Sequence, residues 1–202
     1  MIPSKSLLPY YGGKAGQIGR DTAAVLDTIG HRCYCELFGG MASVLLYKKP
    51  VLQELYNDLN ADIVNLFAVL RNPRTRKQFV EAVHFSPYSR EEWKYACHHY
   101  QDLELDKVER ARLMFILLGQ GALGRLYRKS FGCGSAMYGT SMPKSFYKKL
   151  LRVDEFVDRF RNVILEKQDA LKLAVRWDKA GVLQYWDPPY VPATRSSGGD
   201  YL

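Results

Sequence analysis

A short motif near the end of the chain combines a carboxylate, two rigid rings and an aromatic face: Asp187, Pro188, Pro189 and Tyr190. The motif follows an apolar segment that is expected to be a strand, and α/β proteins place ligand-contacting residues just beyond such strands. The Asp187 carboxylate and the main-chain carbonyl of Pro188 can each accept a hydrogen bond from an amino group conjugated to an aromatic ring, which polarises that amine toward attack on a methyl donor. Tyr190 offers a face for a base flipped out of a duplex. A Pro-Pro turn with a capping Asp also ends strands for structural reasons, so other motifs must decide.

Three segments in the first third of the chain carry further residues of the kind that hold a ligand. They are residues 8–14 (LPYYGGK), 36–43 (ELFGGMAS) and 57–60 (NDLN). Gly39 and Gly40 let the backbone approach a ligand closely and adopt a positive φ. Asp58 follows an expected strand, where its carboxylate can accept hydrogen bonds from both hydroxyls of a ribose. Taken singly, such features are more often structural, but their occurrence together and in this order favours function.

Together with the motif at Asp187, these segments resemble the Dam-like adenine-N6 DNA methyltransferases, whose catalytic motif reads D-P-P-Y, and the resemblance covers nearly the whole chain. It implies S-adenosylmethionine as the cofactor and direct in-line transfer of its methyl group to N6 of an adenine in double-stranded DNA. Lys14 is then expected to pair with the methionine carboxylate, and Asp169 to contact the cofactor adenine. The residues that the resemblance assigns to the cofactor are Tyr10, Tyr11, Gly13, Lys14, Glu36, Phe38, Gly39, Gly40, Ser43, Asp58, Asn60 and Asp169.

The chain also departs from the family pattern. Leu37 stands where the family has Pro, and Ala42 replaces the last Gly of the cofactor loop, so we expect weaker cofactor binding because of the added methyl group. Thr194, Arg195 and Tyr201 match a T-R…Y pattern of phage-like members, which suggests a phage or prophage setting. The family continues beyond this segment with further strands and helices. We therefore expect a truncated protein whose open sheet edge favours self-association, whereas the complete enzyme is expected to be a monomer.

The hydrophobic pattern indicates an α/β fold with parallel strands. Strands are expected over residues 32–38, 51–56, 162–166 and 181–186, and helices over 22–29, 42–47, 61–71, 90–100, 105–118 and 146–160. The resemblance makes this a Rossmann-like class I methyltransferase sheet with a mainly helical inserted target-recognition region. We accordingly divide the chain into an S-adenosylmethionine-binding part (1–71), a helical and basic target-recognition region (72–161) and a catalytic part (162–202).

Basic residues concentrate in the second half of the inserted region. The whole chain has 29 Lys and Arg against 21 Asp and Glu, a net charge of +8 that favours a polyanionic partner. We expect Arg125, Arg128, Lys129 and Lys144 to contact DNA, although the sequence does not decide which of them reads a base and which holds a phosphate. The alternative is a solvated basic helix face. The local basic residues are Arg125, Arg128, Lys129, Lys144, Lys148, Lys149, Arg152, Arg159 and Arg161, interleaved with Tyr127, Phe131, Tyr138 and Tyr147.

Other chemistries fit the residues less well. Cytosine-C5 methylation needs a Cys nucleophile, usually after Pro, and none of Cys33, Cys35, Cys97 and Cys133 follows a Pro. We expect reduced, buried thiols and no metal site, since the chain has no C-x-x-C pair. Cytosine-N4 methylation and a truncated, inactive DNA-binding protein remain open alternatives. A start without signal-peptide character and the lack of a stretch of roughly 20 apolar residues predict a cytoplasmic protein with no membrane partner.

Overall fold

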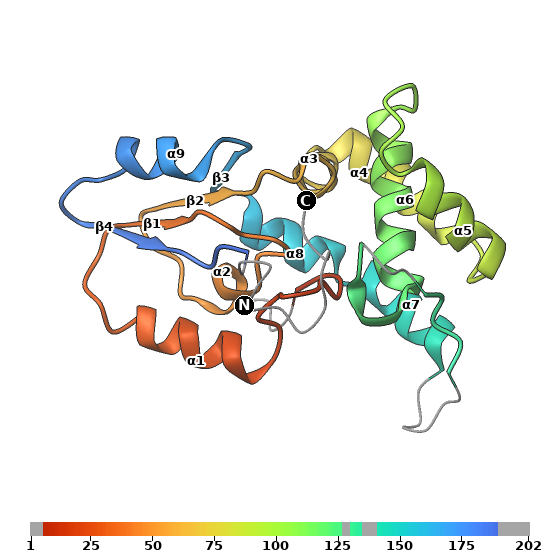
Figure 1. The fold of residues 1–202 in the computed structure, drawn as a ribbon, viewed down its shortest axis with the longest axis horizontal. Coiled ribbons are helices and arrows are strands. Elements are labelled where there is room, and N and C mark those ends of the chain that lie inside the picture. Colours follow the sequence, from red (N-terminus) through yellow and green to blue (C-terminus); the bar gives the residue numbers. More distant parts are fainter. Residues whose placement is uncertain (1–5, 127–129, 135–140, 190–202) are drawn as a thin grey trace.

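The computed structural model describes residues 6–126, 130–134 and 141–189. Its strands are β1 (Cys33–Glu36), β2 (Gln53–Asn57), β3 (Val163–Glu166) and β4 (Val182–Tyr185). Its helices are α1 (Gln17–Leu26), α2 (Ser43–Tyr47), α3 (Ala61–Arg71), α4 (Pro73–His84), α5 (Arg90–His99), α6 (Lys107–Gln120), α7 (Met142–Leu150), α8 (Val153–Phe160) and α9 (Ala170–Arg176), with a short 3-10 turn, η1 (Ala122–Gly124). Figure 1 shows α1 and α9 on opposite sides of the strands, and α4 to α7 gathered beside the sheet.

The four strands form one sheet in the order β3-β2-β1-β4. Glu36 at the end of β1 lies opposite Tyr56 of β2 and Tyr185 of β4. Asn57 at the end of β2 lies opposite Glu166 of β3. Each of these pairings is parallel, which confirms the predicted α/β sheet. Because the strands run in the same direction, the loops after β1, β2 and β4 meet at one edge of the sheet.

The two faces of the sheet pack against different helices, since successive side chains of a strand point to opposite faces. On one face, Cys35 and Leu55 join Leu173 of α9 in a small apolar cluster. On the other face, Tyr34 and Tyr56 belong to the main core, which includes residues of α1, α2, α3 and α8. Both faces of the central strands are therefore covered, as expected for a parallel sheet.

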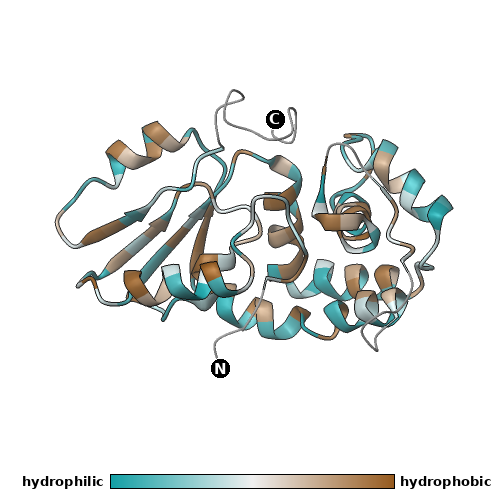
Figure 2. Cartoon of the chain, turned by 60° about the horizontal axis from the view of Figure 1, so that its bottom comes forward, coloured by the Kyte–Doolittle hydropathy of each residue, from teal (hydrophilic) through white to brown (hydrophobic). Residues whose placement is uncertain are grey.

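The helices between β2 and β3 extend the main core away from the sheet. α6 lies at their centre, buries the run from Leu113 to Leu118 and packs against α3, α4 and α5. Figure 2 shows that these helices are amphipathic, with hydrophobic and hydrophilic residues on different faces. One continuous hydrophobic core thus joins the sheet to the inserted helices.

α8 holds the inserted helices against the sheet. Its Phe156 and Phe160 rings stack 4.5 Å apart, and Phe67 of α3 packs on both at 5.0 and 5.1 Å. Beside these rings, the Arg159 guanidinium donates to both carboxylate oxygens of Glu54 in β2, with Nη2 2.9 Å from Oε1. Arg159 is only 9% exposed. The prediction that Arg159 belongs to a DNA-facing basic surface is therefore wrong, because its charge is taken up inside the fold.

Two parts of the helical region differ from the sequence prediction. α4 was not predicted, although Asn72 caps it by accepting hydrogen bonds from the amides of Arg74 (2.9 Å) and Thr75 (3.3 Å), and Pro73 fits its first turn. The single helix predicted over 146–160 is divided into α7 and α8. The first difference is a missed helix, whose start a capping side chain marks, and the second is a boundary that hydrophobic periodicity does not show.

In the part of the chain that the structure describes, no helix has the length and apolar character needed to cross a bilayer, and no three potential metal ligands come together. Of the four thiols only that of Cys35 is buried, whereas Cys133 is exposed and Cys33 and Cys97 are partly exposed, so the expectation of buried thiols is wrong for three of the four. β3 and β4 form the edges of the described sheet. Self-association through an open edge stays a prediction.

Candidate active site

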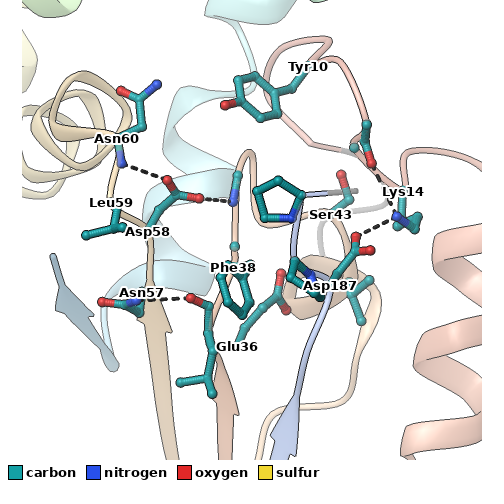
Figure 3. A pocket seen from close by; sticks show the side chains of 18 of the residues that line it. Tyr10, Lys14, Glu36, Phe38, Ser43, Asn57, Asp58, Leu59, Asn60 and Asp187 are labelled. Atoms are coloured by element: carbon teal, nitrogen blue, oxygen red, sulfur yellow. Dashed lines mark hydrogen bonds and ion pairs between the residues drawn. The ribbon is translucent and has the colours of Figure 1, made fainter. Parts of the chain in front are cut away.

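A cavity of about 410 Å³ lies at the edge of the sheet where the parallel strands end. Binding sites for small molecules commonly enclose about 300–1,000 Å³. Figure 3 shows side chains from the N-terminal loop and from the ends of β1, β2 and β4 converging on it. The lining residues are Tyr10, Tyr11, Gly12, Gly13, Lys14, Glu36, Leu37, Phe38, Gly39, Gly40, Ser43, Val44, Asn57, Asp58, Leu59, Asn60, Leu126, Ala170, Tyr185, Asp187, Pro188 and Pro189.

The N-terminal loop brings Lys14 to Asp187 of the D-P-P-Y motif. The amide of Gly13 donates to the carbonyl of Tyr10 at 3.0 Å, and a Cβ at Gly13 would lie 2.9 Å from that oxygen, so the tight turn needs glycine. The Lys14 ammonium then lies 2.5 Å from Oδ2 of Asp187 and 3.3 Å from the carbonyl oxygen of Gly12. The resemblance implied a cofactor carboxylate as the partner of Lys14, whereas here the ammonium pairs with Asp187.

The loop after β1 is shaped by close backbone contacts. A Cβ at Gly39 would fall 2.1 Å from Cε2 of Tyr56, so only glycine allows this approach. Gly40 has a φ of +49°, and Ala42 has a φ of 56° and a ψ of 33°. Ala42 is therefore in the left-handed region, where a side chain is disfavoured. The structure thus explains the family preference for glycine at this position through backbone conformation, and not only through the volume of the methyl group.

Glu36 is a buried acid at the cavity wall. It is 2% exposed, and Oε2 accepts a hydrogen bond of 2.8 Å from the hydroxyl of Tyr34. Burial raises the pKa of Glu36 to about 8, the nearby Asp187 raises it further, and the hydrogen bond from Tyr34 opposes this shift. Near neutral pH, Glu36 therefore holds a proton that a bound cation could displace.

Asp58 joins the loops that follow β1 and β2. Its Oδ2 accepts from the amide of Gly40 at 2.7 Å and its Oδ1 from the amide of Asn60 at 2.8 Å. Burial raises the pKa of Asp58, and these two backbone hydrogen bonds oppose the shift. Each carboxylate oxygen has a second lone pair, so the same group can still accept hydrogen bonds from ligand hydroxyls.

Asn60 and Asn57 stabilise the loops around Asp58. Oδ1 of Asn60 caps α3 by accepting from the amides of Asp62 and Ile63 at 3.0 and 3.3 Å. Asn57 donates to the carbonyls of Leu37 and Gln168, both at 3.0 Å, and so links three loops. The sequence predicted no role for Asn57. Its position directly after a buried strand, next to Asp58, was the available signal.

The end of β4 presents the D-P-P-Y motif to the cavity. Asp187, Pro188 and Pro189 line it, and Trp186 packs on the ring of Phe38 with 6.0 Å between ring centres. Tyr190 lies outside the described residues. The other predicted catalytic and cofactor residues, apart from Asp169, all line the same cavity. Residues that are far apart in the sequence are therefore brought together.

Asp169 lies next to the cavity without lining it. Its carboxylate caps α9 by accepting from the amide of Lys172 at 2.9 Å, and the residue is exposed. Its neighbour Ala170 does line the cavity. A helix cap accounts for Asp169 in this structure, and its contact with a cofactor stays a prediction.

The predicted DNA-binding residues are only partly described. Arg128 and Lys129 lie outside the described residues. Lys144 is exposed in the first turn of α7. The Arg125 guanidinium lies over the ring of Tyr11, 5.1 Å from its centre. In the same region, the hydroxyl of Tyr147 donates to the carbonyl of Ser86 at 2.8 Å, which is a structural contact.

The cavity offers a distinctive set of interactions. Glu36 and Asp58 supply carboxylates, Lys14 supplies an ammonium and Phe38 supplies an aromatic face. This set fits a ligand that carries a positive centre, a carboxylate, ribose hydroxyls and a flat ring. Asp187 and the prolines that follow it line the same cavity.

Two comparisons with known proteins bear on this site. A model of the family described as D12 class N6 adenine-specific DNA methyltransferase matches residues 10–201 of the chain. A search among curated proteins gave no match.

Proposed function

The chain belongs to the family of D12 class N6 adenine-specific DNA methyltransferases, and from this premise we propose that the cavity binds S-adenosylmethionine and receives an adenine extruded from duplex DNA. The main observation in support is that Lys14, Glu36, Asp58 and Asp187 converge on one cavity of about 410 Å³. A base must leave the helical stack before an enzyme can act on its amino group. The cavity lies at an edge of the sheet, where such a base can enter beside Asp187.

Each part of the cofactor has a matching group in the cavity. Bound S-adenosylmethionine supplies an electrophilic methyl group on a positively charged sulfonium. Asp58 is placed to accept the ribose hydroxyls, and Lys14 to pair with the methionine carboxylate. Glu36 balances the positive charge of the cofactor once it has lost its own proton. Phe38 offers an aromatic face for the adenine ring.

Asp187 and Pro188 prepare the adenine amine. Asp187 accepts one N6 hydrogen bond and the Pro188 carbonyl accepts the other, which concentrates electron density on the nitrogen. With the cofactor bound, the N6–methyl bond would form as the methyl–sulfur bond breaks, and the Asp187 carboxylate would take the surplus proton from N6. Lys14 engages Oδ2 of Asp187, so Oδ1 is the second acceptor on that carboxylate. No covalent intermediate with the protein is needed, because the cavity positions both reactants.

The DNA is held, in this proposal, by the helical and basic region between β2 and β3. Arg125, Arg128, Lys129 and Lys144 would neutralise phosphates or read base edges. The support is the position of the loop that carries Arg125, since its next residue, Leu126, lines the cavity. Residues 72–161 thus act as the target-recognition region, and the flanking parts bind the cofactor and the adenine.

Cofactor binding is the first test of this function. Titration calorimetry with S-adenosylmethionine should give a saturable one-to-one isotherm for the wild type and a weaker one for Asp58→Asn. An inactive DNA-binding protein would give no heat of cofactor binding while still retarding duplex DNA in a gel. The cytosine-N4 alternative is separated by which base carries the methyl group after turnover.

A further inference from the structure

The loop after α6 is in close backbone contact with the N-terminal loop that lines the cavity. The amide of Tyr11 donates to the carbonyl of Gly124 at 3.0 Å. Gly124 has a φ of +61°, and a Cβ there would lie 2.4 Å from the carbonyl carbon and oxygen of Pro9. Leu123, just before it, also has a φ of 61° and is 71% exposed. Non-glycine residues in this conformation are uncommon and often mark functional loops.

This contact fixes Arg125 at the rim of the cavity. Its guanidinium lies 5.1 Å from the ring centre of Tyr11, while its neighbour Leu126 is 7% exposed and lines the cavity. The Nε atom of Arg125 is buried and has no hydrogen-bond partner among the described residues. A buried donor without an acceptor is unfavourable, so a ligand oxygen that reaches this edge of the guanidinium would relieve the cost.

We propose that Arg125 binds a phosphate that flanks the extruded adenine nucleotide while its planar face stays on Tyr11. This inference rests on the proposed function, because it takes the adenine to lie beside Asp187. With the base inside the cavity, the sugar and its flanking phosphates must lie at the rim, where Arg125 is placed. The guanidinium offers two donors in one plane to a phosphate, and Arg125 as a whole is only partly buried.

The location favours a phosphate over a base edge as the ligand. Base edges are read in the grooves of the duplex. Arg125 instead packs on Tyr11, a residue of the cavity wall. Arg125 is therefore assigned to positioning the reacting nucleotide, and reading of the surrounding sequence falls to other residues.

The test uses a duplex that the wild-type protein has been shown to methylate, so that failure of the proposed function is recognised before this experiment begins. Either phosphate flanking the target adenine is replaced by a neutral methylphosphonate, and dissociation constants are measured with S-adenosylhomocysteine present. The variants are Arg125→Ala, Arg125→Lys and, as a control, the exposed Arg176→Ala in α9.

For one of the two phosphates, neutralisation should weaken wild-type binding by roughly tenfold or more, in keeping with a hydrogen bond to a charged group. Arg125→Ala should bind the normal duplex about as weakly and should lose its sensitivity to that methylphosphonate. Arg125→Lys should keep part of the sensitivity, because it retains the charge without the planar stack. Arg176→Ala should behave as the wild type.

The proposal is overturned if Arg125→Ala remains as sensitive as the wild type at both phosphates, or if it changes which adenines are methylated. An unchanged thermal midpoint for Arg125→Ala would show that its weaker DNA binding comes from loss of this contact and not from loss of folding.

Discussion

The ammonium of Lys14 lies 2.5 Å from Oδ2 of Asp187, and this ion pair joins residues separated by 173 positions in the sequence. Their side chains are 20% and 23% exposed, so the pair is partly shielded from water. It connects the loop assigned to the cofactor with the motif assigned to the adenine amine. The proposed binding of the cofactor and the proposed binding of the adenine must therefore each change the interaction between Lys14 and Asp187.

Lys14→Met tests the role of the ammonium in holding the cofactor. Loss of a hydrogen bond to a charged group costs about 2 kcal/mol. The dissociation constant for S-adenosylmethionine should therefore increase roughly thirtyfold. Titration calorimetry measures this constant, and the exposed Lys179→Met serves as the matched control. Equal affinities for wild type and Lys14→Met would show that the ammonium serves only Asp187.

Asp187→Asn separates catalysis from binding. The amide keeps the size of the carboxylate but accepts hydrogen bonds more weakly and no longer pairs with Lys14. We expect kcat to fall by about 10²–10⁴-fold, the range found for positioned acid–base groups. Single-turnover methyl transfer measures this effect, with the exposed Asp178→Asn as control. A loss confined to the KM for DNA would assign Asp187 to binding alone.

Ala42→Gly should stabilise the protein. Ala42 has a φ of 56°, a conformation that costs a residue with a side chain about 1–2 kcal/mol. Part of this gain is offset by the greater freedom of glycine in the unfolded chain, which leaves about 0.5–1 kcal/mol. The free energy of urea-induced unfolding measures the change. The exposed Ala68→Gly within α3 should have the opposite sign, at a cost of about 1 kcal/mol.

Glu36 should make cofactor binding depend on pH. Its pKa is raised to about 8, first by burial, so the carboxyl is protonated at lower pH and must ionise to pair with a cation. Affinity for S-adenosylmethionine should therefore rise with pH, by up to about tenfold per unit below the pKa. It should level off near pH 8, as Glu36 becomes ionised, and fall above it, because the cofactor amine has a reference pKa of about 7.7–8.0 and loses its own charge. Calorimetric titrations across this range should show no such rise for Glu36→Gln.

Arg159→Met tests whether this residue is structural. Removing one partner of a buried ion pair leaves Glu54 with an uncompensated charge and typically costs about 3–5 kcal/mol. Arg161 offers a matched control, because it pairs with Asp158 at the surface. The side chains of Arg161 and Asp158 are 69% and 71% exposed, respectively. Arg161→Met should change the free energy of unfolding by less than about 1 kcal/mol. Similar small changes for both variants would contradict the structural assignment of Arg159.

Much of the sheet and its edge could be predicted because local pattern determines it. The apolar strand segments and the helix over residues 61–71 recur in the structure as β1 to β4 and α3. Gly39 and Asp58 could be placed at the site because each follows a predicted strand, and parallel strands end at a common edge. The order of the elements and the chemistry of their side chains are enough to place these residues.

Contacts that depend on the folded chain could not be predicted in this way. The sequence does not show that Lys14 meets Asp187, because their distance is set by packing of the whole sheet. Arg159 appeared as one basic residue among several until its burial against Glu54 was known. Asp169 matched a cofactor-binding position by its place in the sequence, yet its carboxylate caps α9. The position of a charged residue in the sequence thus does not show which group it pairs with in the folded protein.

Transfer of isotope-labelled methyl from S-adenosylmethionine to mixed-sequence duplex DNA tests the central claim most directly, with nucleosides resolved by mass spectrometry and Asp187→Ala as the control. The account predicts labelled N6-methyladenine with the wild type and none above background with the variant. Label on cytosine, or equal adenine labelling by Asp187→Ala, would contradict it.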